Sequence, residues 1–248
     1  MGGALVVGLL LFVLLVVRPF GGANPAVPAS SDNPYGLVKP SVTIPAAAVN
    51  GRTLGKVDAP VTIDVWADFQ CPFCGQFART VEPQIIANFV DTGIVNLVAH
   101  DFTFLGAGHD PDESVDAAVA ARCAEQQGRF WDYYMTLYWN QGATENGGAF
   151  ARPRLLAMAS LLGLNQATFQ ACLDDQTVRA AVAAEKAQGQ AAGVSGTPTS
   201  FINGTKVQGF KDYPTMAALI TAAVPSASPT RTGAPGSASP SAGPSTSP

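Results

Sequence analysis

The sequence predicts a mixed α/β domain, and three observations support this fold class. A β-branched and aromatic run at 61–66 has the composition of a buried strand, and a helical pattern follows it directly. A long Ala- and Leu-rich region of helical spacing then separates this unit from a second strand-like segment beyond Gly196. With 47% apolar and 13% charged residues, the chain is not a disordered polyampholyte, and its net charge of −4 argues against a nucleic-acid partner.

The first segment, 1–17, has no charged side chain and ends before Arg18. As a helix it would measure about 26 Å, at the short edge of what spans a bilayer core. We interpret it as a signal anchor or signal peptide rather than a buried helix; whether it is cleaved stays open. No Lys or Arg precedes the run, so we hypothesise that the true start lies upstream and that a short basic segment is missing.

Two further segments differ from the domain in composition. Six of the 19 prolines fall in 19–50, so 18–50 is predicted to be an extended, Pro-rich linker. Residues 225–248 hold six Pro and seven Ser and are predicted to form a disordered tail without chemistry. The folded domain is therefore expected at 51–224.

Within the domain, the strand VTIDVW (61–66) is followed by the loop ADFQ and by a helix that opens at Cys71. Pro72 suits the first helical turn, and Pro83 should kink the helix. The next strand is VNLVAHDF. Helices are then expected near 112–125, 129–139, 152–162, 165–173 and 177–190, with Gly163 and Asn165 as caps, and the final helix at about 213–224.

The four cysteines allow three pairings, and an exported protein meets oxidising conditions. Cys71 and Cys74 form a Cys-Pro-Phe-Cys run, whereas Cys123 and Cys172 lie far apart in the helical region. The simplest pairing joins Cys71 to Cys74 and Cys123 to Cys172. The second bridge would close a loop of about 50 residues and stabilise the fold by roughly 4 kcal/mol. The alternative is two buried free thiols.

Cys71 is predicted at a helix N-terminus, where unpaired amides and the helix dipole favour a thiolate. Lowering its pKa from about 8.5 to about 6 requires roughly 3.4 kcal/mol. The dipole supplies about 0.3–2 kcal/mol, so direct hydrogen bonds must provide the rest. Cys74, one turn further on, would be the resolving thiol. Zinc is disfavoured, because His100 and His109 are nine residues apart and no second CxxC exists; neither histidine is assigned a role.

The runs DAPVTIDVWADFQCPFC (58–74), DTGIVNLVAHDF (91–102), AARCAEQQGRFWDYYMTLY (120–138) and GVSGTPTSFING (193–204) resemble the DsbA-like thiol:disulfide oxidoreductases. The resemblance spans about 51–224, in the family's order and spacing. It implies a thioredoxin fold with an inserted α-helical domain, here at about 109–193.

The resemblance also implies roles for other residues. Thr197 and Pro198 match the family's Thr-Pro pair, whose cis bond faces the CxxC and aligns a substrate strand; the alternative is an ordinary trans turn. Asp64 would replace a buried Glu that exchanges a proton with Cys74, unless it faces solvent at the strand edge. Asp68 is expected at the loop surface. Phe73 stands where the strongest oxidants carry His, which predicts a less oxidising pair.

These features together predict a membrane-tethered, extracytoplasmic thiol:disulfide oxidoreductase on the bacterial cell membrane, secreted if the first segment is cleaved. Its substrates would be exported cysteine-containing proteins, and a DsbB-type or VKOR-type membrane protein would reoxidise it. This exchange needs no organic cofactor or metal. The aromatic residues at helical spacing are expected in the core rather than in a cofactor site: Phe130, Trp131, Tyr134 and Tyr138. The alternatives are a reductase or isomerase of the same fold, or a non-catalytic thioredoxin-fold binding module.

Overall fold

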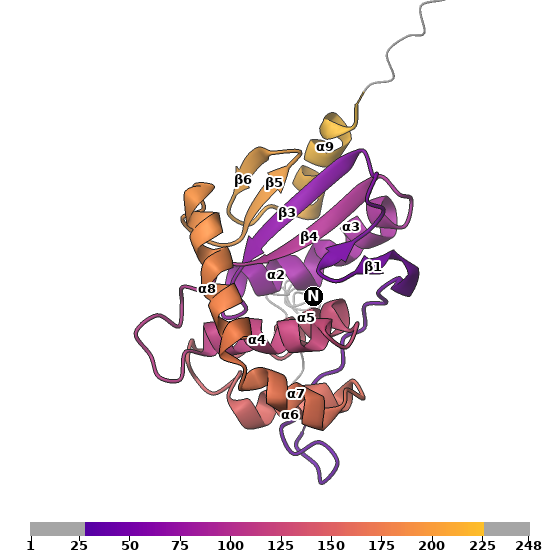
Figure 1. The fold of residues 1–248 in the computed structure, drawn as a ribbon. Helices are drawn as coiled ribbons and strands as arrows, with labels where there is room; N and C mark the ends of the chain where they lie inside the picture. Colours follow the sequence, from indigo (N-terminus) through magenta and orange to yellow (C-terminus); the bar gives the residue numbers. More distant parts are fainter. Residues whose placement is uncertain (1–27, 226–248) are drawn as a thin grey trace, which may run out of the picture.

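The computed structural model describes residues 28–225 and confirms the mixed α/β fold (Figure 1). The signal segment 1–17, the first part of the linker and the tail from 226 onward lie outside the described residues. Within 28–225 the strands form one six-stranded sheet in the order β1-β2-β4-β3-β5-β6. The strands are β1 (Val49–Asn50), β2 (Thr53–Leu54), β3 (Val61–Ala67), β4 (Val95–Asp101), β5 (Thr199–Ile202) and β6 (Thr205–Gln208).

Strands β3 and β4 form the centre of the sheet and run parallel, with Trp66 opposite His100. β5 pairs antiparallel with β3 on its other side. Side chains along a strand alternate between the two faces. Ile63 and Val65 therefore point into the main hydrophobic core, whereas Trp66 belongs to a second, smaller cluster with Phe102.

Helices cover both faces of the sheet. The main-core face packs against α2 (Pro72–Thr80), α3 (Glu82–Ile85), the π-helical turn η2 (Ile86–Val90) and α9 (Tyr213–Ala223). α8 (Gln176–Ala191) reaches the other face, where Gly189 lies against Trp66 and Phe102. Figure 1 shows α8 rising from the helical layer to the end of the sheet.

The helical insertion consists of α4 (Glu113–Glu125), α5 (Phe130–Trp139), α6 (Arg152–Leu161), α7 (Gln166–Leu173) and α8. Local interactions determine where helices of the insertion begin and end. The Asn165 side chain accepts from the Thr168 amide at the start of α7, and Gly163 adopts φ 70° after α6. A Cys123–Cys172 disulfide joins α4 to α7, with an S–S distance of 2.02 Å. The four aromatic residues predicted in the core are all buried there.

The described part of the predicted linker is not a free stalk. The Asn140 side chain donates to the Val38 carbonyl (2.8 Å) and accepts from the Val38 amide (2.7 Å). Leu37 is buried beside this contact, and Arg154 donates to the Tyr35 carbonyl. These interactions attach the segment to the helical domain, because one amide side chain satisfies both groups of an extended backbone.

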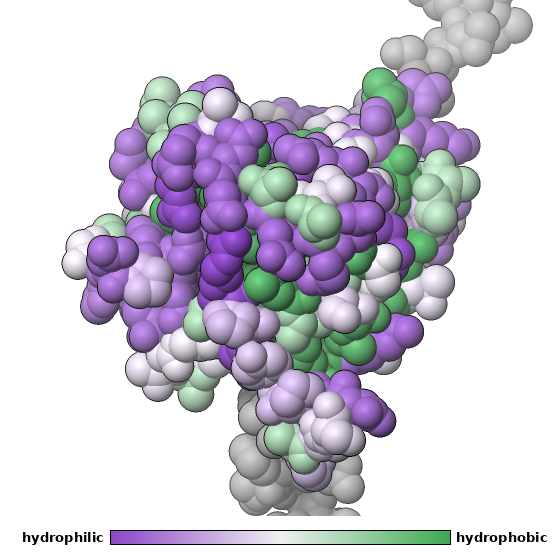
Figure 2. Space-filling model, turned by 60° about the horizontal axis from the view of Figure 1, so that its bottom comes forward, coloured by the Kyte–Doolittle hydropathy of each residue, from purple (hydrophilic) through white to green (hydrophobic). Residues whose placement is uncertain are grey.

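No helix within 28–225 is long and apolar enough to span a membrane. Figure 2 shows the face at the bottom of Figure 1: hydrophilic residues cover much of it, and hydrophobic residues gather towards the lower middle. The exposed apolar side chains on the described surface include Leu161 on α6, at 38% exposure.

Candidate active site

Cys71 lies at the N-cap of α2, directly after the loop that leaves β3. Its amide donates to the Asp68 carbonyl, and its own carbonyl accepts from the Gly75 amide, the first bond of the helix. Pro72 occupies the first helical position, where its missing amide hydrogen costs nothing. The helix breaks at Val81, two residues before Pro83, so the predicted kink is present.

The two thiols are free and electrostatically different. The hydrogen bond from Cys74 lowers the pKa of Cys71 to about 6 against the effect of burial, with support from Thr197 and the amides of Cys74 and Phe73. Burial raises the pKa of Cys74 well above 9. At neutral pH, Cys71 is therefore a thiolate and Cys74 a thiol that donates to it. Cys71 is the more reactive of the two sulfurs.

Thr197 faces both sulfurs from the loop before β5. Its peptide bond to Pro198 is cis, and its carbonyl lies 3.4 Å from Cys71 Sγ, close enough to accept from the thiol form. The Thr197 hydroxyl is buried and has no partner at hydrogen-bonding geometry within 28–225, and the Thr197 side chain lowers the pKa of both thiols. Pro198 has no amide hydrogen to compete for the sulfur.

Asp68 is buried rather than at the loop surface. One carboxylate oxygen accepts from the Gln70 amide and the Ser114 hydroxyl, the other from the amides of Phe104 and Leu105. Burial raises the pKa of this carboxyl despite the four donors. Its partners lie on three separate segments, which no local sequence pattern connects. Asp68 thereby ties the active-site loop to the helical domain.

Gln141, after α5, holds the same loop from the opposite direction. Its Nε2 donates to the carbonyls of Phe69 (2.7 Å) and Cys71 (2.8 Å). A Cβ on Gly75 would come within 2.1 Å of Gln141 Oε1, so this close contact requires glycine. Phe73, inside the CxxC, is 57% exposed and presents an apolar ring beside Cys71.

The assignment of Asp64 as a proton-transfer group for Cys74 is wrong. Its side chain is 35% exposed and lies 2.9 Å from His100 Nε2. The reason is strand alternation: Val65 points into the main core with Cys74, so Asp64 points to the opposite face. His100 had no role assigned from the sequence, but it bridges Asp64 and Glu185 and stacks on Trp66 with ring centroids 4.4 Å apart.

A second buried acid on the cysteine side is Glu82, which sequence reasoning missed. It is fully buried on α3, its Oε1 accepts from Tyr134 (2.8 Å), and its Oε2 has no partner within 28–225. Burial raises its pKa to about 8. Cys74 acts electrostatically on both Tyr134 and Tyr138, and these two rings pack 4.8 Å apart. The sequence feature that could have indicated this buried acid is a single Glu between Val81 and Pro83.

The remaining site residues lie apart from this centre. The Cys123–Cys172 bridge lies between helices of the insertion. In the described chain no group of three His, Cys, Asp or Glu side chains could hold a metal ion. The reactive groups brought together are thus Cys71, Cys74 and Thr197, with Glu82 behind Tyr134. This arrangement suits thiol–disulfide exchange, which needs a stabilised thiolate next to a second thiol.

Comparisons with known proteins agree with this chemistry. A family model described as thioredoxin matches residues 47–222. Disulfide bond formation protein D of Bacillus subtilis (strain 168) is 31% identical over 164 residues, 64% of this chain and 71% of that protein. The Na(+)/H(+) antiporter NhaA 1 of Salinispora arenicola is 30% identical over 181 residues, which is 73% of this chain but 26% of the antiporter.

Among solved structures, oxidised BdbD from Bacillus subtilis superposes with a TM-score of 0.64 at 26% identity. The match covers 76% of this chain and 98% of BdbD, so it includes the sheet and the helical insertion. The fold, the matched family and the free cysteine pair lead to the same conclusion: this chain belongs to the DsbA-like thiol:disulfide oxidoreductases of the thioredoxin superfamily.

Proposed function

We propose that the protein introduces disulfide bonds into exported proteins through the Cys71-Pro-Phe-Cys74 pair. The observation that carries this proposal is the difference between the two thiols: the pKa of Cys71 is about 6, and that of Cys74 is well above 9. A stabilised Cys71 thiolate makes the reduced form favourable. A disulfide whose reduced form is stabilised is a stronger oxidant.

In this direction a substrate thiolate attacks Cys71 Sγ of the Cys71–Cys74 disulfide. The S–S bond breaks, a mixed disulfide forms, and Cys74 leaves as a thiolate. A second substrate thiolate then attacks the substrate sulfur of the mixed disulfide and releases Cys71 as a thiolate. The substrate gains a disulfide, and the protein gains two electrons. A membrane protein of the DsbB or VKOR type would take up these electrons and restore the oxidised pair.

Two neighbouring groups assist these steps. Thr197 and Pro198 form the loop beside which a substrate peptide aligns as an additional strand, while the Thr197 hydroxyl stabilises the Cys71 thiolate. Glu82 is the proton source for Cys74: with a pKa of about 8 it is protonated at neutral pH, and Cys74 needs a proton when it leaves. Tyr134 donates to Glu82 and is influenced by Cys74. In this step Tyr134 gives its hydroxyl proton to the Cys74 thiolate and takes the proton of Glu82, which becomes a carboxylate.

The segment 1–17 would tether the domain to the membrane, with the catalytic part on the extracytoplasmic side, or direct secretion if it is cleaved. Exported proteins with cysteines are then the accessible substrates. N-terminal mass spectrometry and membrane fractionation of the native protein test this placement. A soluble cytoplasmic protein that retains Met1 would contradict it.

A reductase or isomerase is the second candidate, because the same exchange runs in either direction. Equilibration with glutathione buffers decides between them. A potential near about −120 mV supports the oxidase, and one near about −270 mV supports the reductase. A non-catalytic binding module is the third candidate. If wild-type protein and Cys71→Ser gave equal yields when a reduced, denatured ribonuclease refolds, this third interpretation would replace the enzymatic one.

A further inference from the structure

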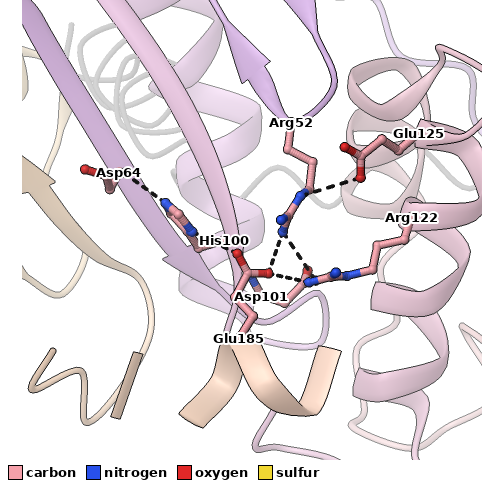
Figure 3. A network of polar contacts seen from close by, with 7 residues as sticks. All are labelled: Arg52, Asp64, His100, Asp101, Arg122, Glu125 and Glu185. Carbon is pink, nitrogen blue, oxygen red and sulfur yellow. Dashed lines mark hydrogen bonds and ion pairs between the residues drawn. The ribbon is translucent and has the colours of Figure 1, made fainter. Parts of the chain in front are cut away.

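A charged cluster surrounds the end of β4 (Figure 3), and the reaction proposed above does not use it. Its members Asp64 and His100 lie on the face of the sheet opposite the cysteines. The cluster joins Asp64 on β3, His100 and Asp101 on β4, Arg52 before β2, Arg122 on α4 and Glu185 on α8. Elements from the whole length of the domain therefore meet at one place. Glu185 is central, because it contacts His100, Arg52 and Arg122.

Glu185 is almost fully buried in this cluster. Its Oε1 lies 2.9 Å from His100 Nδ1, while Oε2 binds both arginines and the Asp101 amide. Burial raises the pKa of Glu185, but these partners outweigh it and lower the pKa to about 2. Burial likewise lowers the pKa of His100, but Asp64 and Glu185 raise it to about 9. The contact between Glu185 on α8 and His100 on the sheet is thus ionised at neutral pH.

The same helix leads to the active site. One turn after Glu185, Gly189 lies against both rings: a Cβ there would come within 2.7 Å of Trp66 and 2.8 Å of Phe102. The Val194 amide donates to the Gly189 carbonyl (2.8 Å), and the Val194 side chain packs into the cluster of the two rings. Thr197 follows three residues later. Between Gly189 and Thr197 the chain contacts the sheet through Val194 and through the Gly193 carbonyl, which accepts from Lys206 on β6, whereas residues 190–192 and 195 are exposed.

We propose that Glu185 is a positioning residue: by holding α8 on the sheet, the charged cluster fixes where Thr197 stands beside Cys71 and so controls the reactivity of that sulfur. The inference goes beyond the direction of exchange proposed above, because it concerns the Cys71 thiolate in either direction. It assigns a function to a cluster that would otherwise only stabilise the junction between sheet and helical insertion.

The test is the alkylation rate of Cys71 by iodoacetamide, measured from pH 4.5 to 8 by mass spectrometry of its peptide in the full-length, reduced protein. Glu185→Gln keeps the shape of the side chain but removes its charge. We expect the midpoint of the profile to rise by about half a unit, which makes alkylation roughly threefold slower at pH 5.5. A purely structural residue would lower the unfolding midpoint and leave this profile unchanged.

Asp174→Asn is the matched control, because Asp174 pairs with Arg152 in an exposed contact outside the cluster. It should leave the Cys71 profile as in wild type. If Glu185→Gln does not fold, His100→Gln serves the same comparison, since it removes the other half of the contact. An unchanged profile in the folded variant, or an equal shift in Asp174→Asn, overturns the proposal. The readout does not depend on the redox direction, so failure of the oxidase assignment would leave this result standing.

Discussion

Glu82→Gln tests the buried acid behind the cysteines through the stability of the fold. Burial raises the pKa of Glu82 from 4.5 to about 8. At pH 7 the unfolded chain ionises this carboxyl, whereas the folded chain keeps it protonated. The difference destabilises the fold by about 1.36 kcal/mol per pH unit above 4.5, or about 3 kcal/mol at pH 7. Gln is neutral in both states, so the variant should unfold at higher denaturant concentration at pH 7.

The direction in which stability changes with pH follows from proton binding: between pH 4.5 and 8 the folded state binds more protons at Glu82 than the unfolded state does. Stability from this group is therefore fully present below 4.5 and is lost as the pH rises to 8. Urea unfolding followed by circular dichroism, at intervals from pH 4 to 8.5, should give curves for wild type and variant that coincide near pH 4 and separate above it. Glu145→Gln, an exposed acid, is the control and should change neither curve.

The same substitution should slow exchange, because it removes the proton that we assign to Cys74. General acid catalysis contributes about 10²-fold or more, so single-turnover oxidation of a dithiol peptide should slow by at least that order. A variant that is more stable yet slower separates catalysis from folding. If Glu82→Gln destabilised the fold at pH 7, or oxidised the peptide at the wild-type rate, the role of Glu82 would be refuted.

Three further substitutions test other parts of the site. Thr197→Val keeps the shape but removes the hydroxyl, so the pKa of Cys71 should rise from about 6, as thiolate absorbance would show; an unchanged titration contradicts the assigned role. Replacing both Cys123 and Cys172 by Ala opens a loop of 49 residues and should lower the free energy of unfolding by about 4 kcal/mol, with a loss below 1 kcal/mol as the contrary result. Phe73→His places an imidazole beside Cys71 and should raise the reduction potential by about 15–30 mV in glutathione buffers; no change or a decrease would contradict that expectation.

Much of the fold could be predicted because local chemistry determines it. Asn165 caps its helix in any tertiary setting, and Pro72 suits a first turn whatever lies around it. The helix ends predicted from such residues lie within one or two positions of the observed ones. The docked segment near Val38 was not predictable in this way. It depends on the amide of Asn140, 102 residues further along the chain.

Sequence reasoning misplaced Asp64 and Asp68 and missed Glu82, and for Asp64 and Glu82 the reason is that tertiary packing decides which side chains face the cysteines. The strand pattern located Asp64 in β3 correctly, but its role required knowing which face the cysteines occupy. Val65 and Asp64 alternate, and only the packing of α2 decides that the Val65 side is the core. For Glu82, the break at Val81 interrupts the helical phase, so counting from Cys74 could not place it.

Hydrogen bonding and burial make the two sulfurs differ, and the distribution of charge over the two faces preserves that difference. On the core face Glu82 stays neutral, the Asp68 carboxyl is held by four hydrogen-bond donors, and burial keeps Cys74 protonated. The ionised carboxylates Asp64 and Glu185 lie beyond the sheet and are paired with His100 and arginines. Had the acid of β3 stood at Val65 instead of Asp64, its ionised form would raise the pKa of Cys71 and weaken it as a leaving group. The alternation of side chains along β3 therefore keeps the Asp64 carboxylate on the face away from the sulfurs, where Glu185 holds α8. The loop that carries Thr197 connects the two faces.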